Sequence, residues 1–194
     1  MTESTQQAAV GHAASPVSAT ASEVVVRDAD SADIAAIQAI YAHHVLKGTG
    51  SFEESPPDEA ELRTRRDAVT ERGLPYLVAE SEGRVCGFAY AALFRPRSAY
   101  RFTVEDSVYV DPGAVGLGIG GRLLEGLMQR CGALGYRQMV AVIGDSANDR
   151  SIALHRSRGF RHAGVLLAVG CKFDRSLDVV FMQRTLADDP TTPS

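Results

Sequence analysis

Four glycines in one short stretch are the residues of this chain best suited to bind an anion. They are Gly116, Gly118, Gly120 and Gly121, and they lie between a strand-like segment, Val108–Val110, and a run of apolar residues at helical spacing. Glycine has no Cβ, so backbone N–H groups at the start of that helix can approach a phosphate closely, and the helix dipole favours its negative charge. The pattern therefore predicts a phosphate-binding turn. A purely structural turn is the alternative, because Gly-x-Gly-x-Gly alone is a weak motif.

Two common phosphate-binding motifs do not fit this turn. A P-loop ends in Gly-Lys-Ser or Gly-Lys-Thr, whereas this turn ends in Gly120-Gly121-Arg122. The dinucleotide-binding fingerprint opens a parallel βαβ unit at the start of a domain, whereas this turn lies deep in the chain, after strands that are expected to be antiparallel. The phosphate is therefore expected to belong to another kind of ligand.

The composition favours one domain that acts on a small molecule. The chain has 194 residues, of which 45% are hydrophobic, and a net charge of -4, so it can bury its own core. Basic residues are scattered among acidic ones, which argues against nucleic-acid or membrane partners. No apolar segment approaches the roughly 20 residues of a membrane-spanning helix. We expect a cytoplasmic protein, with tails at 1–22 (disordered) and 187–194 (flexible) around a domain at 23–186.

Cysteine usage gives no sign of a metal site or a disulfide framework. Cys86, Cys131 and Cys171 are odd in number and lack Cys-x-x-Cys spacing. We therefore expect three small core residues of a protein in a reducing compartment, and no metal.

Periodicity and turn signals predict the order of the elements. A strand at Val24–Arg27 precedes two helices that end near Gly48 and Gly73. The predicted elements that follow are strands at 76–80, 85–94 and 103–110, the glycine turn with its helix up to Gly135, a strand at 139–143, a helix at about 150–158, and strands near 160–169 and 179–186. The expected fold class is α/β (α+β), with a mixed, mostly antiparallel sheet of about seven strands and about four helices in the order β-α-α-β-β-β-α-β-α-β-β.

Four further segments carry specific motifs. The run 148–160 reads Asn-x-x-Ser-x-x-Leu-His-x-x-x-Gly-Phe, and the others are TVEDSVYVDP at 103–112, AVIGDSAN at 141–148 and GCKFDRSLDVVFMQ at 170–183. With these motifs the chain, over about residues 24 to 186, resembles the GNAT superfamily of N-acetyltransferases, and within it the phosphinothricin and methionine sulfoximine or sulfone acetyltransferases. The resemblance implies the GNAT fold, acetyl-CoA as co-substrate, and acetylation of the α-amino group of a small amino-acid analogue, which would detoxify that compound.

The resemblance also implies where acetyl-CoA binds. Pantetheine would pair with the backbone of one strand as an added strand, and the glycine turn would hold the pyrophosphate. The implied residues are Val108, Tyr109, Val110, Val115, Gly116, Leu117, Gly118, Ile119, Gly120, Gly121, Asn148 and Ser151. Asn148 is equally suited to cap a helix. Because the superfamily usually has Gln or Arg where this chain has Val115-Gly116, polar contacts to the pyrophosphate fall to Arg122 or to backbone N–H groups.

Glu105 and His155 are the catalytic residues that the resemblance implies. An α-amino group is partly protonated at neutral pH, so its attack on a thioester needs a base, and Glu105 matches the family's base. By alternation alone Glu105 is an exposed strand carboxylate, and its neighbour Asp106 is a dispensable residue on the opposite face. His155 falls where many members carry a Tyr that protonates or stabilises the departing thiolate, although a helical His there is often a packing residue. His43 and His44 are interpreted as structural or substrate-edge residues.

Five positions match those around the amino-acid substrate in the family. They are Phe52, Arg97, Tyr100, Glu105 and Tyr109. The planar guanidinium of Arg97 suits a carboxylate or phosphinate, or else is a solvated loop charge. Ser176 stands where relatives commonly have Trp, so other acceptors stay open: a polyamine, an aminoglycoside or a protein N-terminus, with a non-catalytic acyl-CoA sensor as a further alternative. Because the family forms dimers through its late strands, a homodimer is expected.

Overall fold

The computed structural model describes residues 23–187. The tails predicted at 1–22 and 187–194 lie outside the described residues, apart from Ala187.

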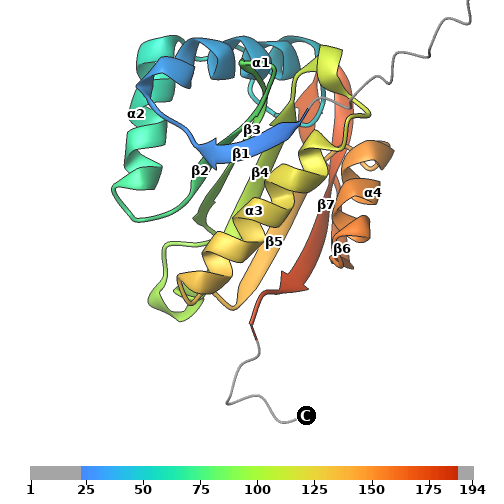
Figure 1. Cartoon of the computed structure of the whole chain (residues 1–194). Helices are drawn as coiled ribbons and strands as arrows, with labels where there is room; N and C mark the ends of the chain where they lie inside the picture. Colours follow the sequence, from blue (N-terminus) through green and yellow to red (C-terminus); the bar gives the residue numbers. More distant parts are fainter. Residues whose placement is uncertain (1–22, 188–194) are drawn as a thin grey trace, which may run out of the picture.

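A seven-stranded sheet in the order β1-β2-β3-β4-β5-β7-β6 forms the centre of the molecule (Figure 1). Neighbouring strands are antiparallel except β4 and β5, which are parallel. The strands are β1 (Val24–Asp28), β2 (Tyr76–Ser81), β3 (Arg84–Leu93), β4 (Thr103–Val110), β5 (Gln138–Gly144), β6 (Arg161–Lys172) and β7 (Arg175–Thr185), and the α-helices are α1 (Ile34–Lys47), α2 (Glu59–Thr70), α3 (Ile119–Ala133) and α4 (Asp149–Ser157). The predicted fold class and element order are confirmed.

Helices pack on both faces of the sheet, and the alternation of side chains along each strand divides the core in two. Leu77 and Ala89 pack with α3, whereas their neighbours in the chain, Val78 and Phe88, pack with α1 and α2. In Figure 1, α3 crosses the front of the sheet with α4 at its right, α1 runs along the top of the view and α2 lies at the left. Successive residues of β4 therefore point toward different helices, which matters for the acidic pair described below.

The last hairpin is longer than predicted. We expected strands ending at Val169 and beginning at Val179, whereas β6 extends to Lys172 and β7 begins at Arg175. The connecting residues, Phe173 and Asp174, have φ angles of 53° and 56°, as in the tight turns that match strand twist. Such turns usually contain Asn-Gly or Asp-Gly, so the sequence carried no hairpin signal here.

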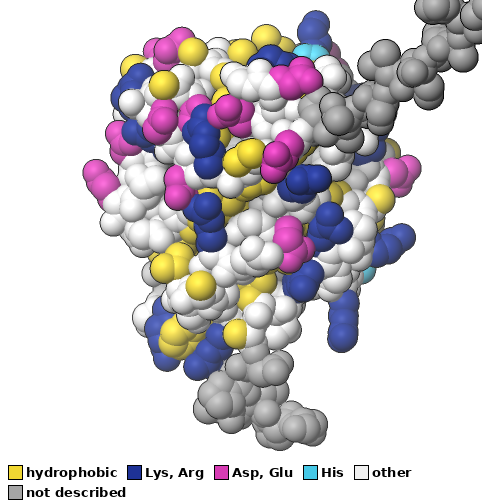
Figure 2. All heavy atoms as spheres, in the orientation of Figure 1, with side chains coloured by type: hydrophobic (Ala, Val, Ile, Leu, Met, Phe, Trp, Pro, Cys, Tyr) yellow, Lys and Arg dark blue, Asp and Glu magenta, His cyan; other side chains and the backbone are white. Residues whose placement is uncertain are grey.

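The surface charge, the helices, the candidate metal ligands and the cysteines can be compared with what the sequence predicted. Charges of both signs are interspersed over the face shown in Figure 2. Across residues 23–187, no helix combines the length and the apolar character needed to cross a membrane, and no group of three His, Cys, Asp or Glu residues is arranged to bind a metal. The three cysteines are free thiols; Cys86 and Cys131 are buried as expected, but Cys171 is exposed, contrary to the prediction.

Candidate active site

Strands β4 and β5 pair over part of their length and then separate. Parallel pairing joins Thr103–Asp106 of β4 to Gln138–Ala141 of β5. Beyond Asp106, β4 continues to Val110 beside β3, whereas β5 continues to Gly144 beside β7. Each strand thus has an open edge here, and an extended ligand can enter as an additional strand.

Alternating hydrogen bonds decide which backbone groups of β4 face this opening. Asp111 donates its N–H to the carbonyl of Cys86 at 2.9 Å, so the odd-numbered residues of β4 turn their N–H and C=O groups toward β3. The backbone of Tyr109 is therefore turned toward β3, which corrects the prediction that it pairs with pantetheine. The backbone groups of Val108 and Val110 face the opening instead.

His44 of α1 already binds one of these groups. Its Nε2 lies 2.9 Å from the carbonyl oxygen of Val110, and a carbonyl only accepts, so the ring nitrogen is the donor. Burial lowers the pKa of His44 and outweighs the opposite effect of the Val110 carbonyl, which favours a neutral ring. The structural interpretation of His44 holds. The N–H and C=O of Val108 and the N–H of Val110 are left for a ligand.

Gly116 and Gly118 give the turn before α3 its backbone conformation. Their φ angles are 91° and 75°, in the left-handed region that glycine adopts without strain. Gly118 is the N-cap of α3, and having no side chain it leaves the first N–H groups of the helix uncapped. A Cβ on either glycine would meet no atom of the described residues within 4 Å. The turn therefore presents N–H donors to open space, as a pyrophosphate requires.

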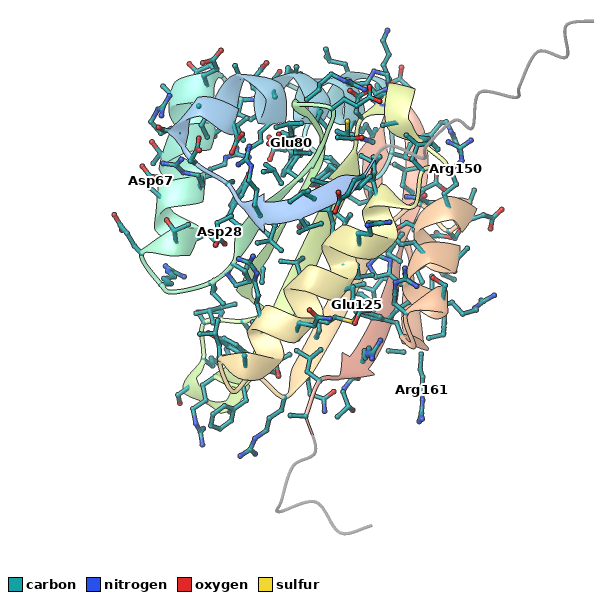
Figure 3. The ribbon with its side chains drawn as sticks, viewed as in Figure 1. Asp28, Asp67, Glu80, Glu125, Arg150 and Arg161 are labelled. Carbon is teal, nitrogen blue, oxygen red and sulfur yellow. The ribbon has the colours of Figure 1, made fainter. Side chains whose placement is uncertain are left out.

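Gly120 and Gly121 differ from this pair, because they allow α3 to pack closely against α4. A Cβ on Gly120 would lie 3.2 Å from Leu154, and one on Gly121 would collide with the guanidinium of Arg158. Arg158 also donates from Nε to the carbonyl of Gly121 at 3.2 Å, and its Nε lies 3.9 Å from a carboxylate oxygen of Glu125. Figure 3 shows Glu125 on α3. Gly120 thus lets α3 approach Leu154 of α4 closely, and Gly121 leaves room for the guanidinium of Arg158; their contacts with acetyl-CoA stay predictions.

The remaining side chains of the turn add no cation to it. Val115 and Leu117 are exposed, and Ile119 is buried in the core beneath α3. Arg122 donates from Nη1 to the carbonyl of Val24 in β1 at 3.1 Å, which favours the other predicted alternative, the backbone N–H groups. Backbone N–H groups remain as the donors of this turn.

Asn148 caps the start of α4. Its Oδ1 accepts from the N–H of Ser151 at 3.3 Å, and its Nδ2 donates to the carbonyl of Gly144, at the open end of β5, at 3.4 Å. The capping role is confirmed. Contacts of Asn148 and Ser151 with acetyl-CoA stay predictions.

Glu105 lies one residue before the separation of β4 and β5, on the face of the sheet that carries α1 and α2. It is half-buried, and its cross-strand partners are Ala92 of β3 and Val140 of β5. Burial raises the pKa of Glu105; the positive charge of Arg95 opposes this effect and the negative charge of Asp106 adds to it, and the net pKa is above the ordinary value. A carboxylate with a raised pKa is a stronger base, which suits proton abstraction near neutral pH.

Replacing Arg95 by glutamine is expected to move the acidic limb of the kcat/KM profile to higher pH. Glu105 must be ionised to act as a base, and losing the guanidinium charge raises its pKa further, so activity falls at a higher pH than in the wild type. The measurement is kcat/KM from pH 5 to 9. Arg101→Gln is the control, because Arg101 lies in the same loop against Phe102 and is not among the groups that shift the pKa of Glu105. An unmoved limb in Arg95→Gln would contradict the assignment of this limb to Glu105.

A hollow lies on each side of Glu105 and includes one of its cross-strand partners. The hollow on the β3 side has a volume of about 340 Å³ and is lined by aromatic residues, Ala92 and the side chains of α2. The hollow on the β5 side measures about 440 Å³ and is lined by Val140, Tyr100, Phe181 and part of β6. Glu105 itself lines neither hollow, but each hollow includes one residue paired with it in the sheet.

Phe52 projects from the loop between α1 and α2 to the open end of β5. A Cβ on Gly144 would lie 2.7 Å from its ring, and a Cβ on Gly170 of β6 would overlap the same ring. The aromatic side chain therefore lies in a slot that only glycines leave open, next to the separation of β4 and β5. A contact of Phe52 with the acceptor stays a prediction.

Two polar contacts hold that loop in place, and sequence reasoning missed both. The hydroxyl of Thr49 donates to Asp145, in the loop before α4, at 3.0 Å. The Nζ of Lys172, which is 2% exposed, donates to the carbonyl of Ser51 at 2.6 Å. Burial lowers the pKa of Lys172. A lysine beside a hairpin normally projects into solvent, so its sequence position gave no indication of this role.

The other predicted acceptor residues lie in the loop between β3 and β4 and in β4 itself. Arg97 is exposed, and its side chain makes no ion pair with the described residues, which leaves the guanidinium available. Tyr100 lines the larger hollow and meets Phe94 edge to face, with ring centroids 5.8 Å apart. The ring of Tyr109 stacks on Phe88 at 5.0 Å, so it forms part of the wall between the sheet and α1.

His155 is not directed toward the opening. It is 4% exposed; Nδ1 lies 2.7 Å from the carbonyl oxygen of Ser151, and Nε2 lies 2.9 Å from Oδ2 of Asp106. Both ring nitrogens already have acceptors, which argues against the predicted role as proton donor to the thiolate. Asp106 is buried and paired with His155, and that it is dispensable for the reaction stays a prediction.

The chain matches known acetyltransferases over most of its length. The Acetyltransferase (GNAT) family model matches residues 37–160. The phosphinothricin N-acetyltransferase of Alcaligenes faecalis is 56% identical over 170 residues, which are 87% of this chain and 85% of that protein. The L-methionine sulfoximine/L-methionine sulfone acetyltransferase of Pseudomonas paraeruginosa is 44% identical over 167 residues, 86% of this chain and 95% of that protein.

A solved structure shows the same fold with its co-substrate. The phosphinothricin acetyltransferase of Sinorhizobium meliloti, crystallised in complex with acetyl-CoA, has a TM-score of 0.84 and 50% sequence identity, and the match covers 88% of this chain and 92% of that one. The chain therefore belongs to the GNAT acetyltransferases and is an acetyl-CoA-dependent amino-acid N-acetyltransferase of the phosphinothricin and methionine sulfoximine group.

Proposed function

We propose that the chain transfers the acetyl group of acetyl-CoA to the α-amino group of phosphinothricin, methionine sulfoximine or methionine sulfone, and so detoxifies such compounds. The observation that carries this proposal is the half-buried carboxylate of Glu105 beside the opening between β4 and β5, with a hollow at each of its two cross-strand partners, Ala92 and Val140. A base next to a strand edge that can bind pantetheine brings the amine and the thioester together.

In the proposed reaction Glu105 accepts one proton from the substrate ammonium group, whose nitrogen then attacks the thioester carbonyl carbon. The carbon–sulfur bond breaks as the amide bond forms, and the sulfur takes the second nitrogen proton through water. The products are the N-acetyl compound, coenzyme A and protonated Glu105, which returns its proton to solvent. Because both ring nitrogens of His155 have other partners, it has no part in these proton transfers.

The charge of Arg97 and the aromatic residues at the site support an amino-acid acceptor. Arg97 is a free guanidinium that can hold the substrate carboxylate or phosphinate, and Phe52 and Tyr100 supply apolar walls. The carboxylate that serves the reaction is a single base, whereas a polyamine site would need several acidic groups to neutralise its charge.

The acceptor is tested by thiol release from acetyl-CoA with phosphinothricin, methionine sulfoximine, methionine sulfone, a polyamine and a peptide with a free N-terminus. We expect kcat/KM for the three amino-acid analogues to exceed that for the polyamine and the peptide by about 100-fold or more, because a site built for a carboxylate leaves its cation unpaired with the others. Comparable turnover of the polyamine or the peptide would contradict the proposed substrate class. Binding of acetyl-CoA without thiol release from any of them would favour a sensor.

The proposed assembly is a homodimer formed through the late strands, in the cytoplasm. The edge strand β6 exposes a row of apolar side chains, Val165, Leu166, Leu167 and Val169, next to the larger hollow. A second copy would cover this edge and help to close the hollow. The free cysteines support a reducing compartment. Light scattering of the purified chain is expected to give twice the chain mass, and a monomer mass would contradict the dimer.

A further inference from the structure

The buried pair of Asp106 and His155 joins two elements that diverge at the active site. Asp106 is the last residue of β4 that pairs with β5, and His155 belongs to α4, the helix that follows β5. The carboxylate–imidazole contact of 2.9 Å therefore spans the base of the opening. Side chains alternate along β4, so Asp106 lies on the face opposite Glu105 and does not touch the reacting groups.

The protonation of this pair follows from its partners. The carbonyl oxygen of Ser151 can only accept, so Nδ1 of His155 carries a proton. Nε2 faces Oδ2 of Asp106, so each ring nitrogen has its own acceptor. Burial by itself lowers the pKa of His155, but the hydrogen bond and charge of Asp106, aided by Ser151, raise it above the ordinary value. Phe160 packs edge to face on the ring, with centroids 5.0 Å apart.

The pair of Asp106 and His155 is expected to add little to the free energy of unfolding. The other carboxylate oxygen of Asp106, Oδ1, is buried and has no hydrogen-bond partner among the described residues. A buried ion pair with an unsatisfied oxygen is usually less stabilising than two well-packed apolar side chains. The pair does, however, fix direction as well as distance, because each ring nitrogen must meet its own acceptor. The unsatisfied oxygen and the place of the pair between β4 and α4 both indicate that it fixes the relative position of these two elements.

We propose that Asp106 and His155 are positioning residues that set the angle between β4 and α4, and thereby hold the free backbone groups of Val108 and Val110 where acetyl-CoA binds. Neither residue is a catalytic residue in this account. The inference rests on the proposed function for the identity of the ligand that occupies the opening.

The test compares acetyl-CoA binding with turnover in matched variants. Asp106→Ala and His155→Ala are each expected to raise the Kd for acetyl-CoA about 10-fold or more, because a small misplacement of a binding edge is enough to cost that much. Because the two residues act as one unit, the double variant should bind no more weakly than either single variant. Asp106→Asn keeps an acceptor for Nε2 and should stay within about threefold of wild type. The Kd is measured by calorimetry, and kcat by thiol release at saturating acetyl-CoA, where it should fall less than the affinity.

Asp33→Ala is the control for loss of a buried carboxylate. Asp33 is 5% exposed and pairs with Arg27 at 2.7 Å, away from the opening, so its loss should lower the melting temperature and leave the Kd unchanged. An unchanged Kd in Asp106→Ala with a lowered melting temperature would show that the pair only stabilises the fold and would overturn the proposal. A fall in kcat of about 100-fold in His155→Ala with unchanged Kd would overturn it in favour of a catalytic histidine. Failure of the proposed function is a separate result, because wild type would then bind acetyl-CoA and acetylate none of the amino-acid analogues.

Discussion

Replacing Glu105 by glutamine is expected to lower kcat about 100- to 10,000-fold, which is the usual contribution of a general base. The amide is close in size to the carboxylate but cannot accept the ammonium proton, so the fraction of attacking amine falls. The Kd for acetyl-CoA should stay within about twofold, because Glu105 lies on the sheet face opposite Asp106 and α4. The measurement is thiol release with phosphinothricin at saturating concentrations of both substrates, combined with calorimetry.

The pH profile and a matched variant make this result specific. The acidic limb of kcat/KM, which the raised pKa of Glu105 places above the ordinary range of a glutamate, should disappear in Glu105→Gln. Glu80→Gln is the control: Glu80 is another partly buried strand carboxylate, in β2, and it pairs with Arg27 at 2.8 Å (Figure 3). We expect unchanged kcat in Glu80→Gln. A kcat for Glu105→Gln within about fivefold of wild type at every pH would remove Glu105 from the mechanism.

Substituting alanine for Gly118 is expected to raise the Kd for acetyl-CoA about 10- to 100-fold. Gly118 caps α3 with a φ of 75° and opens onto free space, so an added methyl group both strains the turn and stands where the pyrophosphate approaches the N–H groups. Losing one hydrogen bond to a charged group costs about 1.5–3 kcal/mol, which is a factor of this size. The measurement is calorimetric titration with acetyl-CoA.

Gly73→Ala separates loss of binding from loss of stability. Gly73 has a φ of 72° and equally open surroundings, but it ends the turn after α2. Both variants should lose about 1–2 kcal/mol of unfolding free energy, the cost of a left-handed alanine. Only Gly118→Ala should lose acetyl-CoA affinity. Equal affinities in the two variants would contradict the assignment of this turn to the pyrophosphate.

Features that depend on neighbouring residues were predictable from the sequence. The order strand, glycine turn and helix between 103 and 133 follows from alternation, helical periodicity and glycine placement, and the helix cap at Asn148 follows from residue type and position. The position of Glu105 near the start of its strand was predictable for the same reason. The prediction that acetyl-CoA binds at this turn required the family motifs, because a glycine turn alone can bind several anions.

Features that depend on long-range partners were not predictable. Asp106 and His155 are 49 positions apart, and neither residue type indicates that the other is its partner. Alternation correctly placed Asp106 opposite Glu105, but it could not show that a buried histidine lies there. The direction of Arg122 depends on the edge strand β1, whose carbonyl at Val24 is 98 positions away. The orientation of the Tyr109 backbone depends on which cross-strand pairs of β3 and β4 exchange hydrogen bonds. The pattern of side chains does not predict which pairs these are.

The most direct test of the central claim is product identification by mass spectrometry and NMR after the chain has reacted with phosphinothricin and acetyl-CoA. The account predicts one acetyl group per phosphinothricin, located on the α-nitrogen, for each thiol released, and almost no product with Glu105→Gln. Thiol release without acetylated phosphinothricin would mean that the opening between β4 and β5 delivers the thioester to water, and an acetyl group at another atom would mean that Glu105 does not face the α-amino group. Either result would contradict the account.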